Sequence, residues 1–105
     1  MLRIVDVIET LICQVRPLAD AVGRKDLDLA KQLRRALSSV LLNIGEGSDQ
    51  RGARRTNHYA IALGSAQEAL LALRAAQAWG YIGAIPEEVD GNFKRVIGTL
   101  VKVAR

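Results

Sequence analysis

Apolar residues recur every three or four positions through most of this chain. The pattern occupies four segments, at about residues 5–22, 29–44, 56–80 and 86–104. Such spacing places apolar side chains on one face of a helix, and no segment shows the alternation typical of a strand. Four amphipathic helices joined by short turns predict an all-α fold, an antiparallel up-and-down four-helix bundle. With 105 residues and neither repeat nor linker, residues 1–105 are expected to form one domain.

Turn and capping residues predict the limits of the first two helices. Gly23 is expected to end the first helix, although Pro17 should kink that helix or end it early. Asp26 or Asp28 can cap the start of the second helix.

The stretch NIGEGSDQRG, residues 43–52, is expected to end the second helix and turn the chain. Glycine accepts the left-handed conformation that commonly follows the last helical turn. The third helix is then expected to begin near Thr56, a good capping residue. The fourth is expected to begin near Pro86, which suits the first position of a helix.

The residues that usually build catalytic, nucleotide or metal sites are scarce. The glycines of residues 43–52 fit no phosphate-binding loop, because they follow a helix at the wrong spacing. A zinc or di-iron site lacks ligands, since Cys13 and His58 are the only cysteine and histidine. Glu46 and Glu68 could form a carboxylate pair, but such residues more often accept hydrogen bonds. We therefore expect no cofactor, no metal and no enzymatic activity.

One enzymatic pattern remains as an alternative. Arg51 and His58, in RGARRTNH, resemble the Arg-x4-6-His motif of the HEPN ribonucleases, in which the arginine would hold a phosphate and the histidine would move a proton. The match is short, and Gly52 stands where that family usually has a polar residue. A solvated histidine in the first turn of the third helix is the favoured interpretation.

Positive charge is concentrated in one part of the sequence. The formal charge is +4, and residues 31–58 hold six basic and two acidic residues, so the excess lies there. Concentrated positive charge is typical of proteins that bind the phosphate backbone. Few aromatic residues accompany it, which favours backbone contact over base reading. The candidate nucleic-acid-binding residues are Lys31, Arg35, Arg51, Arg54 and Arg55. As an alternative, these charges aid solubility or pair with acids, as Arg34 could with Glu46 or Glu68.

Two apolar stripes are expected to lie away from the core. Leu42 shares a side of the second helix with basic residues, and the third helix carries a second stripe of Ile61, Ala72, Ala75 and Trp79. Together they exceed the apolar surface that one small bundle should expose. Self-association into a ring-like or closed homo-oligomer is therefore predicted.

The amino-terminal segment is apolar but carries Asp6, Glu9 and Arg16, which a signal peptide would lack. No apolar stretch approaches the roughly 20 residues of a membrane span. We expect a cytoplasmic protein with no membrane association.

Two stretches, QLRRALSSVLLNIGEGSDQRG and YAIALGSAQEALLALRAAQAWGYI, carry a resemblance to a known family. They resemble the bacterial four-helix bundle family known for the protein encoded in 23S rRNA intervening sequences. The resemblance covers residues 32–82. Leu41, Gly45 and Leu70 depart from the usual proline, alanine and glutamate. The matching positions are Arg34, Arg35, Ala36, Asn43, Ile44, Gly45, Glu46, Gly47, Gly64, Ser65, Glu68, Trp79, Gly80, Tyr81 and Ile82.

This resemblance implies a homopentamer around a central channel. It also implies kinship with the accessory protein of diversity-generating retroelements, a basic pentamer that binds nucleic acid and works with a reverse transcriptase. No enzymatic activity is implied, and most members have no assigned role. The matching polar residues become candidates for a buried structural hub, in which Glu46→Ala should destabilise the fold. The candidate hub residues are Arg34, Asn43, Glu46, Ser65 and Glu68.

These observations favour a non-enzymatic oligomeric module whose basic face contacts RNA, DNA or a nucleic-acid enzyme. A weak metal-independent ribonuclease of HEPN type and a purely structural protein-binding scaffold remain the alternatives.

Overall fold

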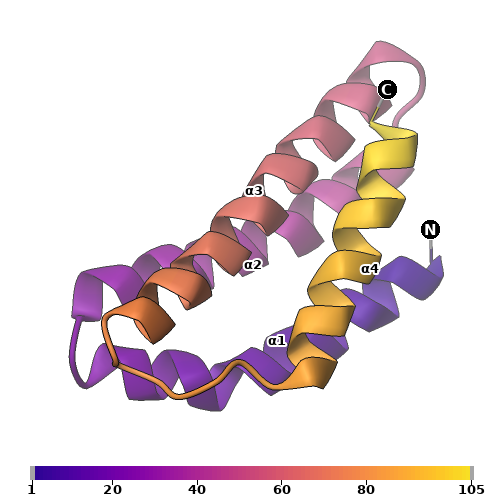
Figure 1. The fold of residues 1–105 in the computed structure, drawn as a ribbon. Coiled ribbons are helices and arrows are strands. Elements are labelled where there is room, and N and C mark those ends of the chain that lie inside the picture. The colour runs from indigo at the N-terminus through magenta and orange to yellow at the C-terminus, as the bar shows by residue number, and fades with distance from the viewer. Residues whose placement is uncertain (1, 105) are drawn as a thin grey trace.

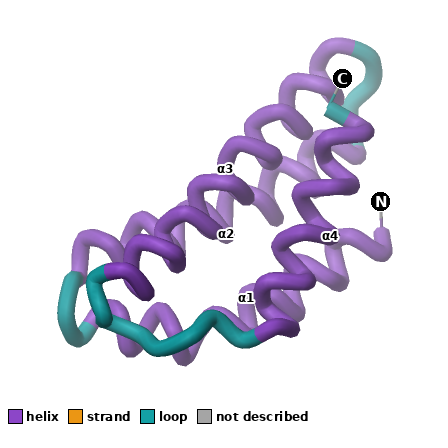
Figure 2. The backbone as a smooth tube through the Cα atoms, viewed as in Figure 1, coloured by secondary structure: helices purple, strands orange, loops and turns teal. Residues whose placement is uncertain are grey.

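The computed structural model describes residues 2–104, which form four helices and no strand (Figure 1). The helices are α1 (Leu2–Gly23), α2 (Leu27–Ser48), α3 (Ala53–Ala78) and α4 (Glu87–Val103). Loops form the three connections between the helices and the residue after α4 (Figure 2). The predicted all-α class is therefore confirmed. Residues 1 and 105 of the predicted single domain lie outside the described part of the chain.

The helices surround one apolar core. Each helix packs against the next in the sequence, α1 also packs against α4, and α2 and α3 form the most extensive pair (Figure 1). This packing is compatible with a four-helix bundle, elongated to 42 × 24 × 19 Å. Among residues 2–104 no polar or charged residue is buried. The largest fully buried side chains include Ile8, Leu11, Leu33, Ile44, Leu73, Phe93 and Leu100.

The first helix continues through Pro17, so the expected early end was wrong. Val15 and Ala19, on either side of Pro17, are both buried in the core. Pro17 itself and Cys13, whose carbonyl loses its hydrogen bond to the missing N–H, are exposed. Water can satisfy that carbonyl, and burial of the apolar face outweighs the lost bond. The helix then ends at Gly23, as expected.

The second helix also continues further than expected. It includes Gly45, Glu46 and Gly47 and ends at Ser48, so the expected helix end within residues 43–52 is confirmed, but the chain turns after these glycines rather than at them. A Cβ atom on Gly47 would lie 2.6 Å from Cε1 of Tyr59 on α3. The glycine therefore allows α2 and α3 to approach closely, rather than supplying a left-handed turn. The chain turns at residues 49–52, where Gly52 has a φ of 59°.

The remaining helix limits mostly agree with the capping signals. Asp26 caps α2, because its Oδ1 accepts a hydrogen bond from the Leu29 amide at 3.0 Å. Helix α4 begins directly after Pro86. Helix α3 begins at Ala53, three residues before the expected cap, and Thr56 donates its hydroxyl to the Gly52 carbonyl from within the helix.

Within residues 2–104, no helix has the length and apolar character needed to cross a membrane.

Candidate nucleic-acid interface

The five predicted nucleic-acid-binding residues lie in two separate groups. Lys31 and Arg35 are exposed on α2, whereas Arg51, Arg54 and Arg55 are exposed at the turn between α2 and α3. At 1.5 Å per residue, Arg35 lies about 20 Å along α2 from the end of that helix. The structure therefore does not bring all five together. We call Arg51, Arg54 and Arg55 the arginine corner.

The start of α3 contributes to this corner. Its N-cap residue is Gly52, and among the described residues no side chain caps the helix and no acid occupies its first turn. Free backbone N–H groups and the positive end of the helix dipole therefore lie in the same short segment, residues 51–55, as the three arginines. The Nε atom of Arg55 donates a hydrogen bond to the Gln50 carbonyl at 2.9 Å, which ties the helix start to the turn. Such an arrangement favours a bound anion such as phosphate.

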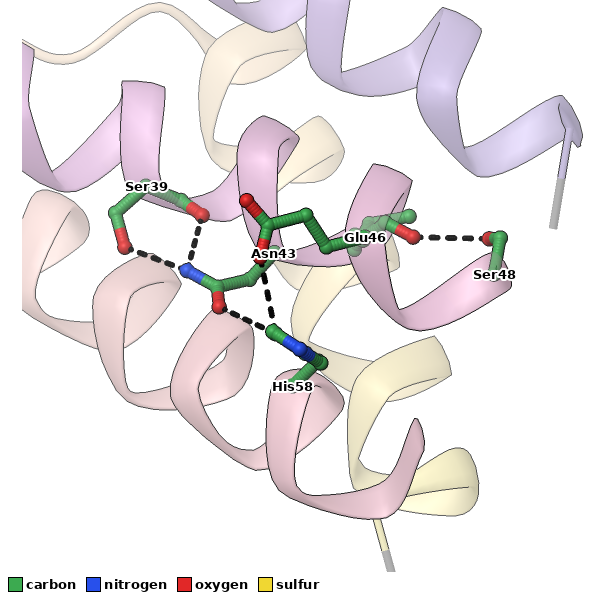
Figure 3. Close-up of polar contacts among 6 residues, drawn as sticks. Ser39, Asn43, Glu46, Ser48 and His58 are labelled. Carbon is green, nitrogen blue, oxygen red and sulfur yellow. Dashed lines mark hydrogen bonds and ion pairs between the residues drawn. The ribbon is translucent and has the colours of Figure 1, made fainter. Parts of the chain in front are cut away.

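A row of polar side chains joins α2 to α3, and Figure 3 shows Ser39, Asn43 and His58 of this row. The hydroxyls of Ser39 and Ser65 lie 2.8 Å apart. The Asn43 amide nitrogen donates to the carbonyl and hydroxyl oxygens of Ser39, at 2.9 and 3.1 Å. The Asn43 Oδ1 atom lies 3.0 Å from Nδ1 of His58. We call Ser39, Asn43, His58 and Ser65 the polar seam.

The seam fixes which nitrogen of His58 carries a proton. The Ser39 carbonyl can only accept a hydrogen bond, so the Asn43 amide group is oriented with its NH2 toward that carbonyl and its oxygen toward His58. Nδ1 of His58 must therefore donate, and Nε2 of the neutral ring keeps its lone pair. Oε2 of Glu46 lies 3.6 Å from the same Nδ1.

The predicted polar hub is corrected by this arrangement. Asn43 and Ser65 belong to the seam, and Glu46 lies at its edge, but its side chain is 64% exposed. Arg34 instead forms an exposed ion pair with Asp20 of α1 at 2.7 Å. Glu68 is exposed on α3. No buried hub of these residues exists in the single chain, because their positions on α2 and α3 point in different directions around the helix axes.

Two seam residues were not predicted as hub members. Ser39 lies one helical turn before Asn43, and that spacing was the available signal. His58 was expected to be a solvated histidine or, as the alternative, a catalytic group, but its side chain is only 24% exposed and contacts Asn43. Its pairing with Asn43 depends on the contact between two helices, which periodicity alone does not specify.

The predicted apolar stripes are exposed only in part. Leu42, Ile61 and Trp79 are exposed, Trp79 by 73%. Ala72 is buried and Ala75 is half-buried, so including them in an outward stripe was wrong. These small residues allow α3 to pack closely against its neighbours.

Other exposed apolar residues were not predicted. Leu27 and Leu71 are more than half exposed. Trp79 stacks on Tyr81 with ring centroids 6.4 Å apart, and this pair lies at the end of α3 opposite the arginine corner.

The fold and the corner define a small all-α protein with a cationic turn at the start of its longest helix. Residues 2–101 match the family described as 23S rRNA-intervening sequence protein, so the chain belongs to this family. The match extends the resemblance of residues 32–82 over all four helices. Neither a curated protein nor a solved structure matches the chain.

Proposed function

We propose that this protein is a non-enzymatic, oligomeric module that binds RNA or DNA through the arginine corner. The observation that carries this proposal is the meeting of Arg51, Arg54 and Arg55 with the uncapped start of α3. Three guanidinium groups and free backbone amides in one place favour phosphate groups. A cytoplasmic setting is part of the proposal.

Backbone contact rather than base reading fits this corner. Tyr59 is the nearest aromatic residue in sequence, and it is buried in the core. The exposed Trp79 and the half-buried Tyr81 lie at the other end of α3, about 39 Å away at 1.5 Å per residue. Stacking and phosphate binding therefore do not coincide, which favours recognition of nucleic-acid shape.

We further infer an antiparallel up-and-down arrangement and self-association. The connections at residues 24–26 and 49–52 are too short to join parallel neighbours, which supports the antiparallel arrangement. Leu71 and Trp79 on α3 supply exposed apolar surface for a neighbouring subunit. The family resemblance favours a pentamer, which requires head-to-tail contacts between different surfaces. A reverse transcriptase or another nucleic-acid enzyme is the proposed protein partner.

The ribonuclease alternative relies on a single favourable observation. The polar seam leaves Nε2 of His58 able to accept a proton. We favour a structural role for His58, because its Nδ1 is committed to the contact with Asn43. A His58→Ala protein that keeps RNA binding and loses RNA cleavage would instead establish the ribonuclease.

The proposal is tested by fluorescence anisotropy with a structured RNA and a duplex DNA at several salt concentrations. We expect affinity to fall steeply with salt, with a logarithmic slope of about −0.9 for each phosphate neutralised on duplex DNA. Replacement of Arg51, Arg54 and Arg55 by alanine should abolish most of the binding.

A matched control removes three exposed cations elsewhere. Arg24, Lys25 and Arg74 are exposed and lie outside the corner, so their alanine variant has the same net charge as the corner variant. An equal loss of nucleic-acid affinity in both variants would show that the binding is a nonspecific attraction to positive charge, and would contradict the proposal. Absence of binding at low salt by the intact oligomer would favour the protein-binding scaffold.

A further inference from the structure

The outward side of α2 carries a stripe of six exposed residues. At 100° per residue, all six lie within about 40° of the direction of Leu42. All are exposed, Leu42 by 63%. Successive members are three or four residues apart, the spacing at which a second helix can pack alongside. We call this set the α2 stripe: Lys31, Arg35, Ser38, Leu42, Glu46 and Asp49.

The α2 stripe has a symmetric order of charges. Lys31 and Arg35 occupy its first half, Glu46 and Asp49 its second half, and Leu42 lies between them. Lys31 and Asp49 are equally distant from residue 40. Arg35 and Glu46 are equally distant from the point between residues 40 and 41. A helix with this order is complementary in charge to a second copy of itself in the opposite direction.

We propose that the α2 stripe binds the α2 stripe of a second copy of this chain about a two-fold axis near residue 40. In this antiparallel contact, Arg35 of each copy faces Glu46 of the other, and Lys31 faces Asp49. The central Ser38 and Leu42 come together at the axis. Such an isologous contact uses the same surface on both subunits.

The charges of the stripe are available for this contact. Within residues 2–104, none of Lys31, Arg35 and Asp49 takes part in an ion pair. Glu46 has only the 3.6 Å approach to His58. By contrast, Arg34, on the α1 side of α2, is already paired with Asp20.

A shallow groove along the same face suits an apolar side chain. Arg35, Ser38, Leu42 and Glu46 are among its lining residues. Leu42, which is 63% exposed, would be covered by its symmetry partner. The apolar groups would supply most of the attraction, whereas the charged pairs fix the direction and register.

A second copy fits this stripe better than a nucleic acid does. The stripe carries two cations and two anions, so its net charge is zero. Glu46 and Asp49 would repel a phosphate backbone that followed α2. The arginine corner has no such acids among its three members. This inference deepens the proposed self-association, on which it rests, and does not depend on the proposed nucleic-acid contact.

Charge reversal provides a direct test by mass. Arg35→Glu and Glu46→Arg are prepared separately, and molar mass is followed with concentration by analytical ultracentrifugation. Each variant alone places like charges opposite each other twice, so its dissociation constant should rise roughly tenfold or more. Mixed in equal amounts, the two variants should associate with each other, because opposite charges again meet at both positions.

The expected mass depends on whether the two-fold contact joins chains or rings. In either case each single variant should show half the mass of the wild type, and the mixture should restore it. Three results would overturn the proposal. The wild type could lack this doubling of molar mass relative to the single variants, the single variants could keep the wild-type mass, or the mixture could fail to associate.

A second pair and a control separate this effect from loss of folding. Lys31→Glu and Asp49→Lys, at the ends of the stripe, should each lose self-association when alone. Mixed together, the two variants should associate again. Arg95→Glu reverses an exposed charge on α4 and should leave the mass unchanged. Only variants that melt like the wild type are compared. If the Glu46→Arg protein fails to fold, the outer pair decides the result by the same criteria.

Discussion

The starts of α3 and α4 are built in opposite ways. Helix α4 begins after Pro86 and has three acids in its first turn, and Asp90 also forms an ion pair with Lys94 one turn later at 2.8 Å. Helix α3 begins after Gly52 with Arg54 and Arg55 in its first turn and no acid. Acids stabilise the positive end of a helix dipole, and cations there oppose it.

This difference indicates at which helix start the local residues stabilise the helix. The start of α4 has the acids that the helix dipole favours, although neither α3 nor α4 has a side-chain cap. The start of α3 lacks such acids and carries two arginines instead. Departures from local rules are expected at functional positions. An anion bound at the arginine corner would relieve the unfavourable charge, which is why we assign the nucleic-acid contact there.

The largest expected effect breaks the packing that holds α4 in place. Phe93 is fully buried in the core, so Phe93→Ala should lower the free energy of unfolding by about 3–5 kcal/mol. The measurement is chemical denaturation followed by circular dichroism. A loss below that of a surface substitution would show that α4 contributes little to the core.

The next largest effect on folding stability is expected where α2 packs closely against α3 at Gly47. Gly47→Ala places a Cβ 2.6 Å from the buried ring of Tyr59 and should destabilise the fold by about 1–3 kcal/mol. Gly45→Ala is the matched control. It meets no atom within 4 Å and should stabilise the helix by about 0.5–1 kcal/mol. Equal melting temperatures for the two variants would contradict the close packing at Gly47.

The polar seam is expected to contribute less to the free energy of unfolding than the close packing at Gly47. Asn43→Ala removes the partner of His58 Nδ1 and should destabilise by about 1 kcal/mol. Glu46→Ala should change the free energy of unfolding by no more than about 0.5 kcal/mol, because that side chain is mostly exposed. This replaces the destabilisation expected from the sequence. A larger loss for Glu46→Ala than for Asn43→Ala would restore the hub hypothesis.

The smallest effects test the opposed helix starts directly. Arg54→Glu should stabilise the free protein by about 0.3–1 kcal/mol and weaken nucleic-acid binding. Glu88→Arg, the mirror change on α4, should destabilise by a similar amount and leave binding unchanged or slightly stronger. Thermal melting and anisotropy on the same samples measure both quantities. If Arg54→Glu raises or lowers both the folding stability and the nucleic-acid affinity, the arginine corner does not exchange stability for binding.

Local features of the chain were predictable from the sequence, although some local predictions failed. The periodic apolar residues predicted four helices, and Gly23, Asp26 and Pro86 predicted their ends correctly. The early end expected at Pro17 does not occur, because burial of the helix face outweighs one lost hydrogen bond. The family was recognised from motifs in the middle of the chain, and the match over residues 2–101 confirms it.

The composition of the candidate site was only partly predictable. The sequence indicated the excess of positive charge but grouped Lys31 and Arg35 with the arginine corner. Their separation follows from the continuation of α2 to Ser48. The partner of Arg34 and the pairing of His58 depend on how neighbouring helices are rotated about their axes.

The sequence by itself therefore determined the four helices, their inward faces and the family. Periodicity and capping are local properties, set by residues a few positions apart. Only the tertiary structure decided that Gly47 is a point of close contact, that Asn43 meets His58, and that the arginines of the turn stand apart from those of α2. These relations join residues on different helices, and their distances follow from packing rather than from sequence spacing.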